Sequence, residues 1–111
     1  MESNMNRTAA IVVTYNRKQL LLECIEGLLR QTCRAFDIWI IDNASNDGTR
    51  EALQPYIDDD RIIYRNTGGN LGGAGGFNHG IKSAVLAGYD LLWIMDDDTV
   101  PAPDALQALL E

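Results

Sequence analysis

The chain of 111 residues has little positive charge, few prolines and aromatics, and only two cysteines. Lysines and arginines number 9 against 16 aspartates and glutamates, which gives a formal net charge of −7 at pH 7. This acidity argues against a general nucleic-acid binder, which needs a basic face to displace counterions from phosphates. If the ligand is a phosphate ester, the same acidity favours a metal ion as mediator, because carboxylates alone would repel it.

Long apolar runs are also missing. No stretch reaches the roughly 20 apolar residues of a membrane span, and Met1–Arg7 lacks the apolar segment of a signal peptide. We therefore expect a cytoplasmic location, with peripheral attachment to the inner face of a membrane left open. Cys24 and Cys33 are not at metal-binding spacing, and we interpret them as small apolar core residues rather than a disulfide pair.

Short apolar runs alternate with helical patterns along a chain long enough for one domain. Their length and β-branched content predict strands over residues 9–15, 36–41, 61–64 and 91–95. Before the first helix, Asn16 is predicted to be the cap, with Gln19 as its capping-box partner. Further helices are predicted over 49–56, after Gly76, and from Pro103 in a first turn through Leu110. This order predicts an α/β fold, a Rossmann-like parallel sheet with helices on both faces.

Polar clusters follow the four predicted strands, and ligands of such folds bind beyond the carboxyl ends of the strands. The clusters lie at residues 14–16, 42–47, 66–70 and 96–98. Because parallel strands end at the same edge of a sheet, we expect these clusters to converge on one site.

Asp96, Asp97 and Asp98 form the sharpest of these clusters. Successive side chains alternate along a strand, so Asp96 and Asp98 are expected on one side and Asp97 on the other. Two convergent carboxylates are hard oxygen ligands that suit Mg²⁺ or Mn²⁺. We therefore predict a metal site at Asp96 and Asp98. The alternative is a solvated acidic turn that caps a helix.

Two further clusters could meet a ligand. Asp42 closes the second strand and could accept hydrogen bonds from a base or ribose, although a turn role is the alternative. Its neighbours Asn43, Ser45 and Asp47 are interpreted as loop and cap residues. Residues 68–76 are predicted to be a glycine-rich loop whose backbone can approach a ligand, with helix N–H groups beyond it for an anion. A flexible loop is the alternative there.

The remaining positions are predicted to be mainly structural. The helix after the glycines should bury one face, made of Phe77, Ile81, Ala84, Val85 and Gly88. Trp39 and Trp93 are interpreted as core residues, and His79 as structural or exposed. The cations that could help to hold phosphates, with scattered surface charge as the alternative, are Arg61, Arg65 and Lys82.

The motifs together resemble those of family-2 glycosyltransferases, which have the GT-A fold. Residues 11–17 (IVVTYNR) are similar to the opening strand and loop of that family, and 41–49 (IDNASNDGT) to its second-strand loop in a rhamnosyltransferase-like form. Residues 70–80 (NLGGAGGFNHG) resemble a subgroup that includes bacterial galactofuranosyltransferases, and 95–99 (MDDDT) its metal-binding Asp-x-Asp motif. The resemblance covers nearly the whole chain and implies the strand order 3-2-1-4.

This resemblance implies a site for a nucleoside-diphosphate sugar. Residues 14–16 would line the nucleoside pocket, Asp42 would bind the base, and Asp96 and Asp98 would hold Mn²⁺ or Mg²⁺. The full set of donor-binding residues that we expect is Thr14, Tyr15, Asn16, Asp42, Asn70, Gly72, Gly73, Gly75, Gly76, Asp96 and Asp97.

The implied activity is an inverting, metal-dependent transfer of a sugar of the UDP-galactofuranose or dTDP-rhamnose type. The acceptor would be a glycan or a lipid-linked glycan of a cell-surface polysaccharide. Family members continue past the position of Glu111 into an acceptor-binding half with the catalytic base. We therefore expect a polar tail over 1–7 and a donor-binding portion over 8–111, truncated at its C-terminus. Such a portion would bind donor without transfer and would self-associate through its bared apolar face.

Three other functions stay open at this point. Residues 96–100 (DDDTV) fit the Asp-x-Asp-x-[Thr/Val] motif of haloacid-dehalogenase-like phosphatases, although that motif belongs near the start of its domain. A nicotinamide-binding Rossmann protein would carry its glycine fingerprint after the first strand, where this chain has Thr-Tyr-Asn-Arg. A non-catalytic nucleotide-binding module would share the strand-end residues but lack transfer.

Overall fold

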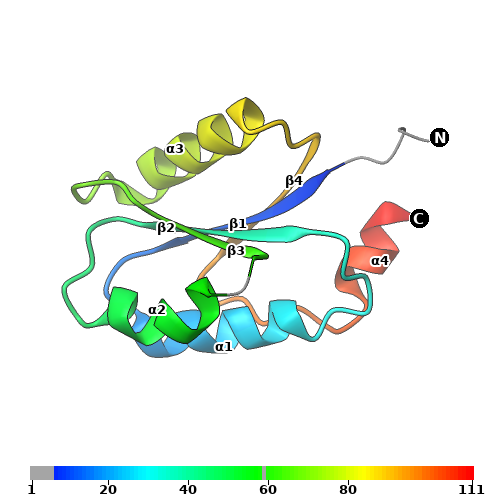
Figure 1. Ribbon diagram of the computed structural model, residues 1–111, viewed down its shortest axis with the longest axis horizontal. Helices are drawn as coiled ribbons and strands as arrows, with labels where there is room; N and C mark the ends of the chain where they lie inside the picture. Colours follow the sequence, from blue (N-terminus) through cyan, green and yellow to red (C-terminus); the bar gives the residue numbers. More distant parts are fainter. Residues whose placement is uncertain (1–6, 59) are drawn as a thin grey trace.

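The computed structural model describes residues 7–58 and 60–111, in which strands and helices alternate (Figure 1). The elements are β1 (Thr8–Thr14), α1 (Lys18–Leu29), β2 (Asp37–Asp42), α2 (Thr49–Ile57), β3 (Ile62–Asn66), α3 (Gly72–Leu86), β4 (Leu91–Asp96) and α4 (Ala105–Leu110). The expected alternation is confirmed, with small shifts at the strand ends. Apart from Arg7, the tail predicted over 1–7 lies outside the described residues.

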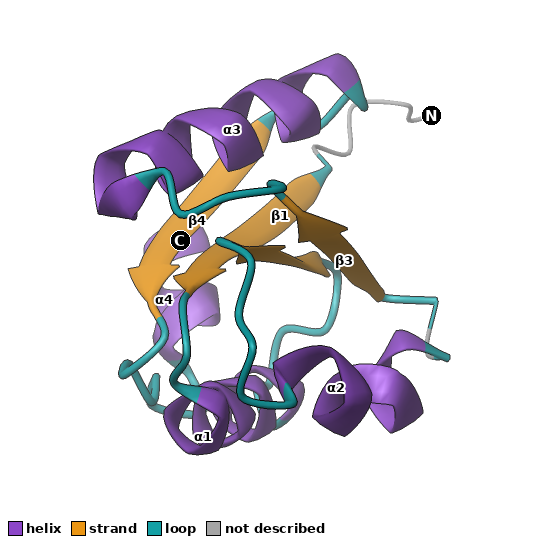
Figure 2. Ribbon diagram, turned by 90° about the vertical axis from the view of Figure 1, so that its left-hand side faces the viewer, coloured by secondary structure: helices purple, strands orange, loops and turns teal. Residues whose placement is uncertain are grey.

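The four strands are parallel and lie in the order β3-β2-β1-β4, as the resemblance implied. Figures 1 and 2 show α3 on one face of the sheet and α1 and α2 on the other. β1 lies between two strands and between two helical layers, and all its residues are buried. Among the described residues, none of the helices has the length and apolar character that crossing a membrane requires.

Alternate residues of β1 feed two separate cores, as the pleat of a strand requires. Ala10 and Val12 join the core under α1, α2 and α4, whereas Ile11 and Val13 join the core under α3. Cys24 is buried in the first core, and both it and Cys33 are free thiols, as expected. The two tryptophans pack in different cores: Trp39 is buried beside Tyr89, and Trp93 is half-buried against Phe36.

α3 packs on the sheet through its smallest residues, which corrects two expectations. The helix begins at Gly72, so much of the predicted glycine-rich loop is helical. Its buried residues are Gly76, Gly80 and Ala84 at intervals of four, whereas Val85, which we expected to be buried, is 55% exposed. Gly88, also predicted on the buried face, is exposed as well.

Close approach of backbones explains this choice of face. A Cβ atom added at Gly80 would lie 2.8 Å from Ile11 Cγ2 and 2.8 Å from Ile41 Cγ1, both on fully buried side chains. Only residues without a side chain allow the helix axis to come this close. A search for large apolar residues therefore finds only part of this face: Ala84 is buried and Phe77 packs against the same core, as expected, but Gly76 and Gly80 are missed.

The start of α1 corrects a third expectation, because Asn16 does not cap it. The helix begins at Lys18, and Asn16 has a left-handed backbone (φ 52°) with its Oδ1 accepting the N–H of Asn46 at 2.8 Å. The first N–H of α1 donates instead to Asp47 Oδ2 at 3.1 Å. Asp47 Oδ1 accepts the first N–H of α2, from Thr49, at 3.2 Å. One carboxylate thus caps two helices, and the cap role expected for Asp47 is confirmed.

Replacing Asp47 with alanine should lower the free energy of unfolding by about 1–2 kcal/mol, the usual cost of losing helix caps. Burial alone would raise the pKa of Asp47, but hydrogen bonds from Thr49 and from backbone N–H groups outweigh it and lower that pKa below 3.8. The contribution is therefore complete above the unfolded value and is lost as pH falls through the folded value. Urea unfolding at pH 7 and pH 3 measures this difference. Asp47→Asn should retain partial capping and lose that pH dependence, and a wild-type pH dependence in this variant would contradict the assignment.

The segment after the aspartates is tied to the end of α1. Gln31 is buried, its Nε2 donates to Ala102 O at 2.7 Å, and its Oε1 accepts the N–H of Leu106 at 3.1 Å. α4 begins at Ala105, so Pro103 lies before it and not in its first turn as predicted. The Pro103 carbonyl accepts the N–H of Thr32 at 2.7 Å instead.

Candidate functional site

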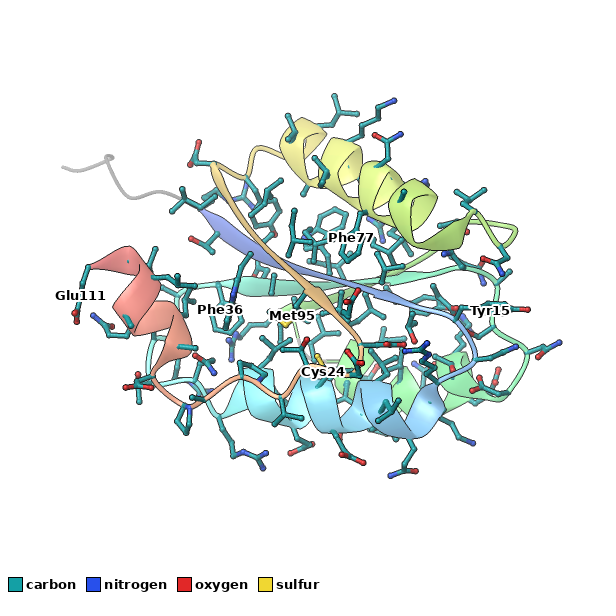
Figure 3. The ribbon with its side chains drawn as sticks, turned by 180° about the vertical axis from the view of Figure 1, so that it is seen from behind. Tyr15, Cys24, Phe36, Phe77, Met95 and Glu111 are labelled. Atoms are coloured by element: carbon teal, nitrogen blue, oxygen red, sulfur yellow. The ribbon has the colours of Figure 1, made fainter. Side chains whose placement is uncertain are left out.

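The polar strand ends meet at one edge of the sheet, as expected. In the strand register Thr14 pairs with Asp42, Asp42 pairs with Asn66, and Asp96 pairs with Val13. Figure 3 shows Tyr15 at this end of the molecule, with Phe36 and Glu111 at the opposite end.

A cleft of about 370 Å³ opens at this edge, between the ends of β1 and β4 and the start of α3. It contains these residues of the expected donor set: Thr14, Tyr15, Asn70, Gly72, Gly73, Asp96 and Asp97. Its remaining lining residues are Val13, Arg17, Asn43 and Phe77. Of the other predicted site residues, those that do not line it are Asn16, Asp42, Gly75, Gly76 and Asp98.

Asp97 is the buried member of the aspartate cluster, with 4% of its surface exposed. Its Oδ2 accepts the hydroxyl proton of Thr14 at 2.9 Å, and its Oδ1 lies 3.4 Å from Arg17 Nη1. The side chain of Arg17 is 55% exposed. The Arg17 side chain therefore lines the cleft, is partly open to solvent, and has its charge paired with the buried Asp97.

Asp96 and Asp98 are both exposed, whereas Asp97 between them is buried. The strand ends at Asp96, and a turn follows in which the Thr99 N–H donates to Asp96 O at 3.1 Å. Within the part of the chain that the structure describes, neither exposed carboxylate makes a hydrogen bond or an ion pair. Their oxygens are therefore available to a hard cation, and in donor chemistry the pair fits Mg²⁺ or Mn²⁺.

Protein ligands alone do not complete a metal site here. Across residues 7–58 and 60–111, His, Cys, Asp and Glu side chains form no group of three that could hold a metal ion. A site built on two carboxylates would need further oxygens from a bound phosphate and from water, which is common for Mg²⁺.

Cys24 lies directly beneath the aspartate turn. Its thiol is 4.0 Å from Asp96 O and 3.9 Å from Met95 Sδ. Burial, together with the negative charges of Asp97 and Asp98, raises the pKa of Cys24 to about 12. The thiol therefore stays neutral, and it supports the turn as a packing group.

Both carboxylate oxygens of Asp42 are engaged, one by Ser45 of its own loop and the other by Tyr64 of β3. Oδ1 accepts the N–H of Ser45 at 2.9 Å and its hydroxyl at 2.6 Å, and Oδ2 accepts the Tyr64 hydroxyl at 2.6 Å. Burial and this bond to Asp42 raise the pKa of Tyr64 to about 12. With 1% of its surface exposed, Asp42 could touch a base only if Ser45 or Tyr64 released it. The loop role expected for Ser45 is confirmed.

The cations that we considered for phosphate binding, with scattered surface charge as the alternative, lie elsewhere. Arg61 stacks over Phe36, 4.9 Å from the ring centroid, at the opposite edge of the sheet, and Arg65 stacks over Trp39. Lys82 and His79 also lie outside the cleft lining. The cation that does line the cleft, Arg17, directly follows the first polar cluster, and that adjacency is the signal that could have identified it.

Comparison with known proteins matches the chain to one family. The model for glycosyl transferase family 2 matches residues 9–111. Over 103 residues the chain is 33% identical to galactofuranosyltransferase GlfT1 of Mycolicibacterium smegmatis, covering 91% of this chain and 33% of that protein. The chain thus spans about a third of the length of this curated relative.

Solved structures share the fold. TarS of S. aureus, solved with UDP, superposes with a TM-score of 0.82 at 23% identity, over 96% of this chain and 31% of that one. Mannosyltransferase PcManGT of Pyrobaculum calidifontis, solved with GDP-Man and Mn²⁺, gives 0.76 at 25% identity, over 94% and 31%. With the family match over 9–111 and the strand order β3-β2-β1-β4, the chain belongs to glycosyl transferase family 2.

Proposed function

We propose that this chain is the donor-binding portion of a metal-dependent, inverting glycosyltransferase. The observation that carries the proposal is a pair of exposed, unengaged carboxylates at the carboxyl edge of the sheet: Asp96, which lines the cleft, and Asp98, two residues further along the chain. Family membership supports sugar transfer over the phosphatase and nicotinamide alternatives.

The carboxylates of Asp96 and Asp98 would hold Mn²⁺ or Mg²⁺, with diphosphate oxygens and water as the other ligands. When bound, the ion supplies Lewis-acid stabilisation of the leaving diphosphate. The PcManGT structure, which contains Mn²⁺ and GDP-Man, supports this choice of cofactor. A metal ion would also offset the electrostatic repulsion between a diphosphate and a chain of net charge −7.

The cleft residues divide by chemistry. Thr14 and Tyr15 would contact the nucleoside, with Tyr15 being 41% exposed at the rim. Arg17 would meet the diphosphate, as the exposed part of its guanidinium offers further N–H donors. Asn70 and the first glycines of α3, residues 72–73, would let the donor approach the backbone closely. Asp42 would act by holding the loop that borders the nucleoside.

The donor would be of the UDP-galactofuranose or dTDP-rhamnose type, and the acceptor a glycan or lipid-linked glycan. The similarity to a galactofuranosyltransferase supports the first of these donors. No acceptor base can be assigned among the cleft residues. Asp96 would bind metal, and Asp97 is already paired with Arg17 and Thr14.

Self-association also stays a prediction. Exposed apolar side chains gather near the open edge of β4, where Ile94 is 47%, Leu109 65% and Leu110 47% exposed. A further groove between β4 and α4 is lined mainly by leucines.

Calorimetric titration tests the proposed function. We expect the 111-residue chain to bind UDP in the presence of Mn²⁺ and to lose that binding in EDTA. We expect no transfer of sugar from UDP- or dTDP-linked donors to glycan acceptors by the chain alone, because the cleft offers no free base. Metal-independent UDP binding would reject the metal role, no binding would reject donor binding, and acceptor-dependent turnover would show that the catalytic machinery has been misplaced.

A further inference from the structure

Asn43 connects three segments at the side of the cleft. It follows β2, is 2% exposed, and its backbone N–H donates to Thr14 O at 3.0 Å. Its side-chain Nδ2 donates to Gly72 O, in the first residue of α3, at 3.0 Å. The Thr67 hydroxyl lies 3.1 Å from Asn43 Oδ1 and 2.6 Å from Gly69 O, so these two acceptors share its single proton.

The first turn of α3 needs such an external attachment. Four of its first five residues are glycine, and no side chain of the N-cap residue Leu71 bonds to the helix. Glycine is about 1 kcal/mol less favourable than alanine in a helix, so local propensity works against order here. At the start of α3, two side chains bond the backbone of Gly72. Asn43 Nδ2 donates to its carbonyl, and Asn70 Oδ1 accepts its N–H at 3.0 Å.

This turn is also part of the cleft, since Gly72 and Gly73 line it. A displacement of the turn would therefore change the shape of the cleft without touching its carboxylates. Further along, Gly76 lies so close to the sheet that a Cβ there would be 3.1 Å from Asn43 Nδ2. Asn43 thus contacts α3 at both Gly72 and Gly76.

We propose that Asn43 is a positioning residue for donor binding, which acts through its hydrogen bond to Gly72. The inference rests on the proposed function, because the ligand in question is the UDP part of the donor. From sequence Asn43 was interpreted as a loop residue, and the contacts confirm that location while giving it this additional effect on the cleft.

Two variants of the same buried contact test the proposal. Asn43→Ala removes the bond to Gly72, whereas Thr67→Val leaves that bond and removes the hydroxyl on the other side of the Asn43 amide, together with its bond to Gly69 O. UDP titration with Mn²⁺ should show about tenfold weaker binding for Asn43→Ala, equivalent to about 1.4 kcal/mol, and less than about threefold for Thr67→Val. Asn46→Ala, at an exposed position of the same loop, should bind as the wild type does.

Amide hydrogen exchange gives a readout that does not need the ligand. Exchange should rise in the first turns of α3 in Asn43→Ala and stay unchanged there in Thr67→Val, with β1 protected in both. If Asn43→Ala does not fold, Asn43→Ser, which is polar but shorter, replaces it.

Equal losses of UDP affinity in the two variants, or none in Asn43→Ala, would overturn the proposal. If the wild type itself does not bind UDP, the proposed function fails. In that case the exchange comparison still decides whether Asn43 holds α3, and equal protection of α3 in both variants would refute it.

Discussion

Gly80→Ala should lower the free energy of unfolding by about 2–3 kcal/mol, although alanine is the better helix former. The added Cβ would lie 2.8 Å from methyl or methylene carbons of Ile11 and Ile41. These β-branched side chains are fully buried in β1 and β2, so neither can turn away. α3 would have to move away from the sheet, and contacts along its buried face would loosen.

Gly73→Ala is the matched control in the same helix. A Cβ at Gly73 meets nothing within 4 Å, so only the gain in helix propensity remains, up to about 1 kcal/mol. Urea unfolding of both variants measures the difference. A Gly80→Ala protein as stable as Gly73→Ala would show that α3 does not pack through its glycines.

Asp96→Asn and Asp98→Asn should each weaken Mn²⁺-dependent UDP binding by about tenfold or more, roughly 1.4 kcal/mol. Each substitution removes a charged oxygen ligand, and since both side chains are exposed and unengaged, the free energy of unfolding should hardly change. Asp97→Asn should instead change the free energy of unfolding more than Mn²⁺-dependent UDP binding. It weakens the buried acceptor of Thr14 and Arg17, at a cost in stability of about 1–2 kcal/mol, and affects the metal less.

Calorimetry with and without Mn²⁺, combined with urea unfolding, separates the two kinds of effect. Equal losses of UDP affinity in all three variants would reject the distinction between the exposed pair and buried Asp97. If none of the three lost affinity, the metal site itself would be rejected.

The sheet could be predicted from the sequence because its central strands, β1 and β2, are buried on both faces. Continuous apolar, β-branched runs such as residues 9–15 have few other stable uses in a chain of this size. The convergence of strand ends followed from parallel pairing alone. The strand order required the family resemblance, because periodicity does not say which strands are neighbours.

The details that sequence reasoning missed depend on contacts between distant residues. Four of residues 72–76 are glycines, which have a low helix propensity, and local rules do not show that Gly76 will pack closely against Val13 and Asn43. The cap of α1 comes from Asp47, in another loop, whereas capping rules consider adjacent residues. Likewise, nothing local shows that Tyr64 will occupy the Asp42 carboxylate.

The glycine face of α3 has a consequence for how this protein can vary. On the opposite face of the sheet, Leu21, Ile25 and Leu28 can exchange with other aliphatic residues, since a loss of volume at one position can be compensated at its neighbour. Gly76 and Gly80 are already the smallest residues, so every substitution there adds volume against Val13, Ile11 or Ile41. We therefore expect substitutions to be tolerated better in the core under α1 than at the glycine contacts between α3 and the sheet. α3 is also the helix whose first turn borders the cleft.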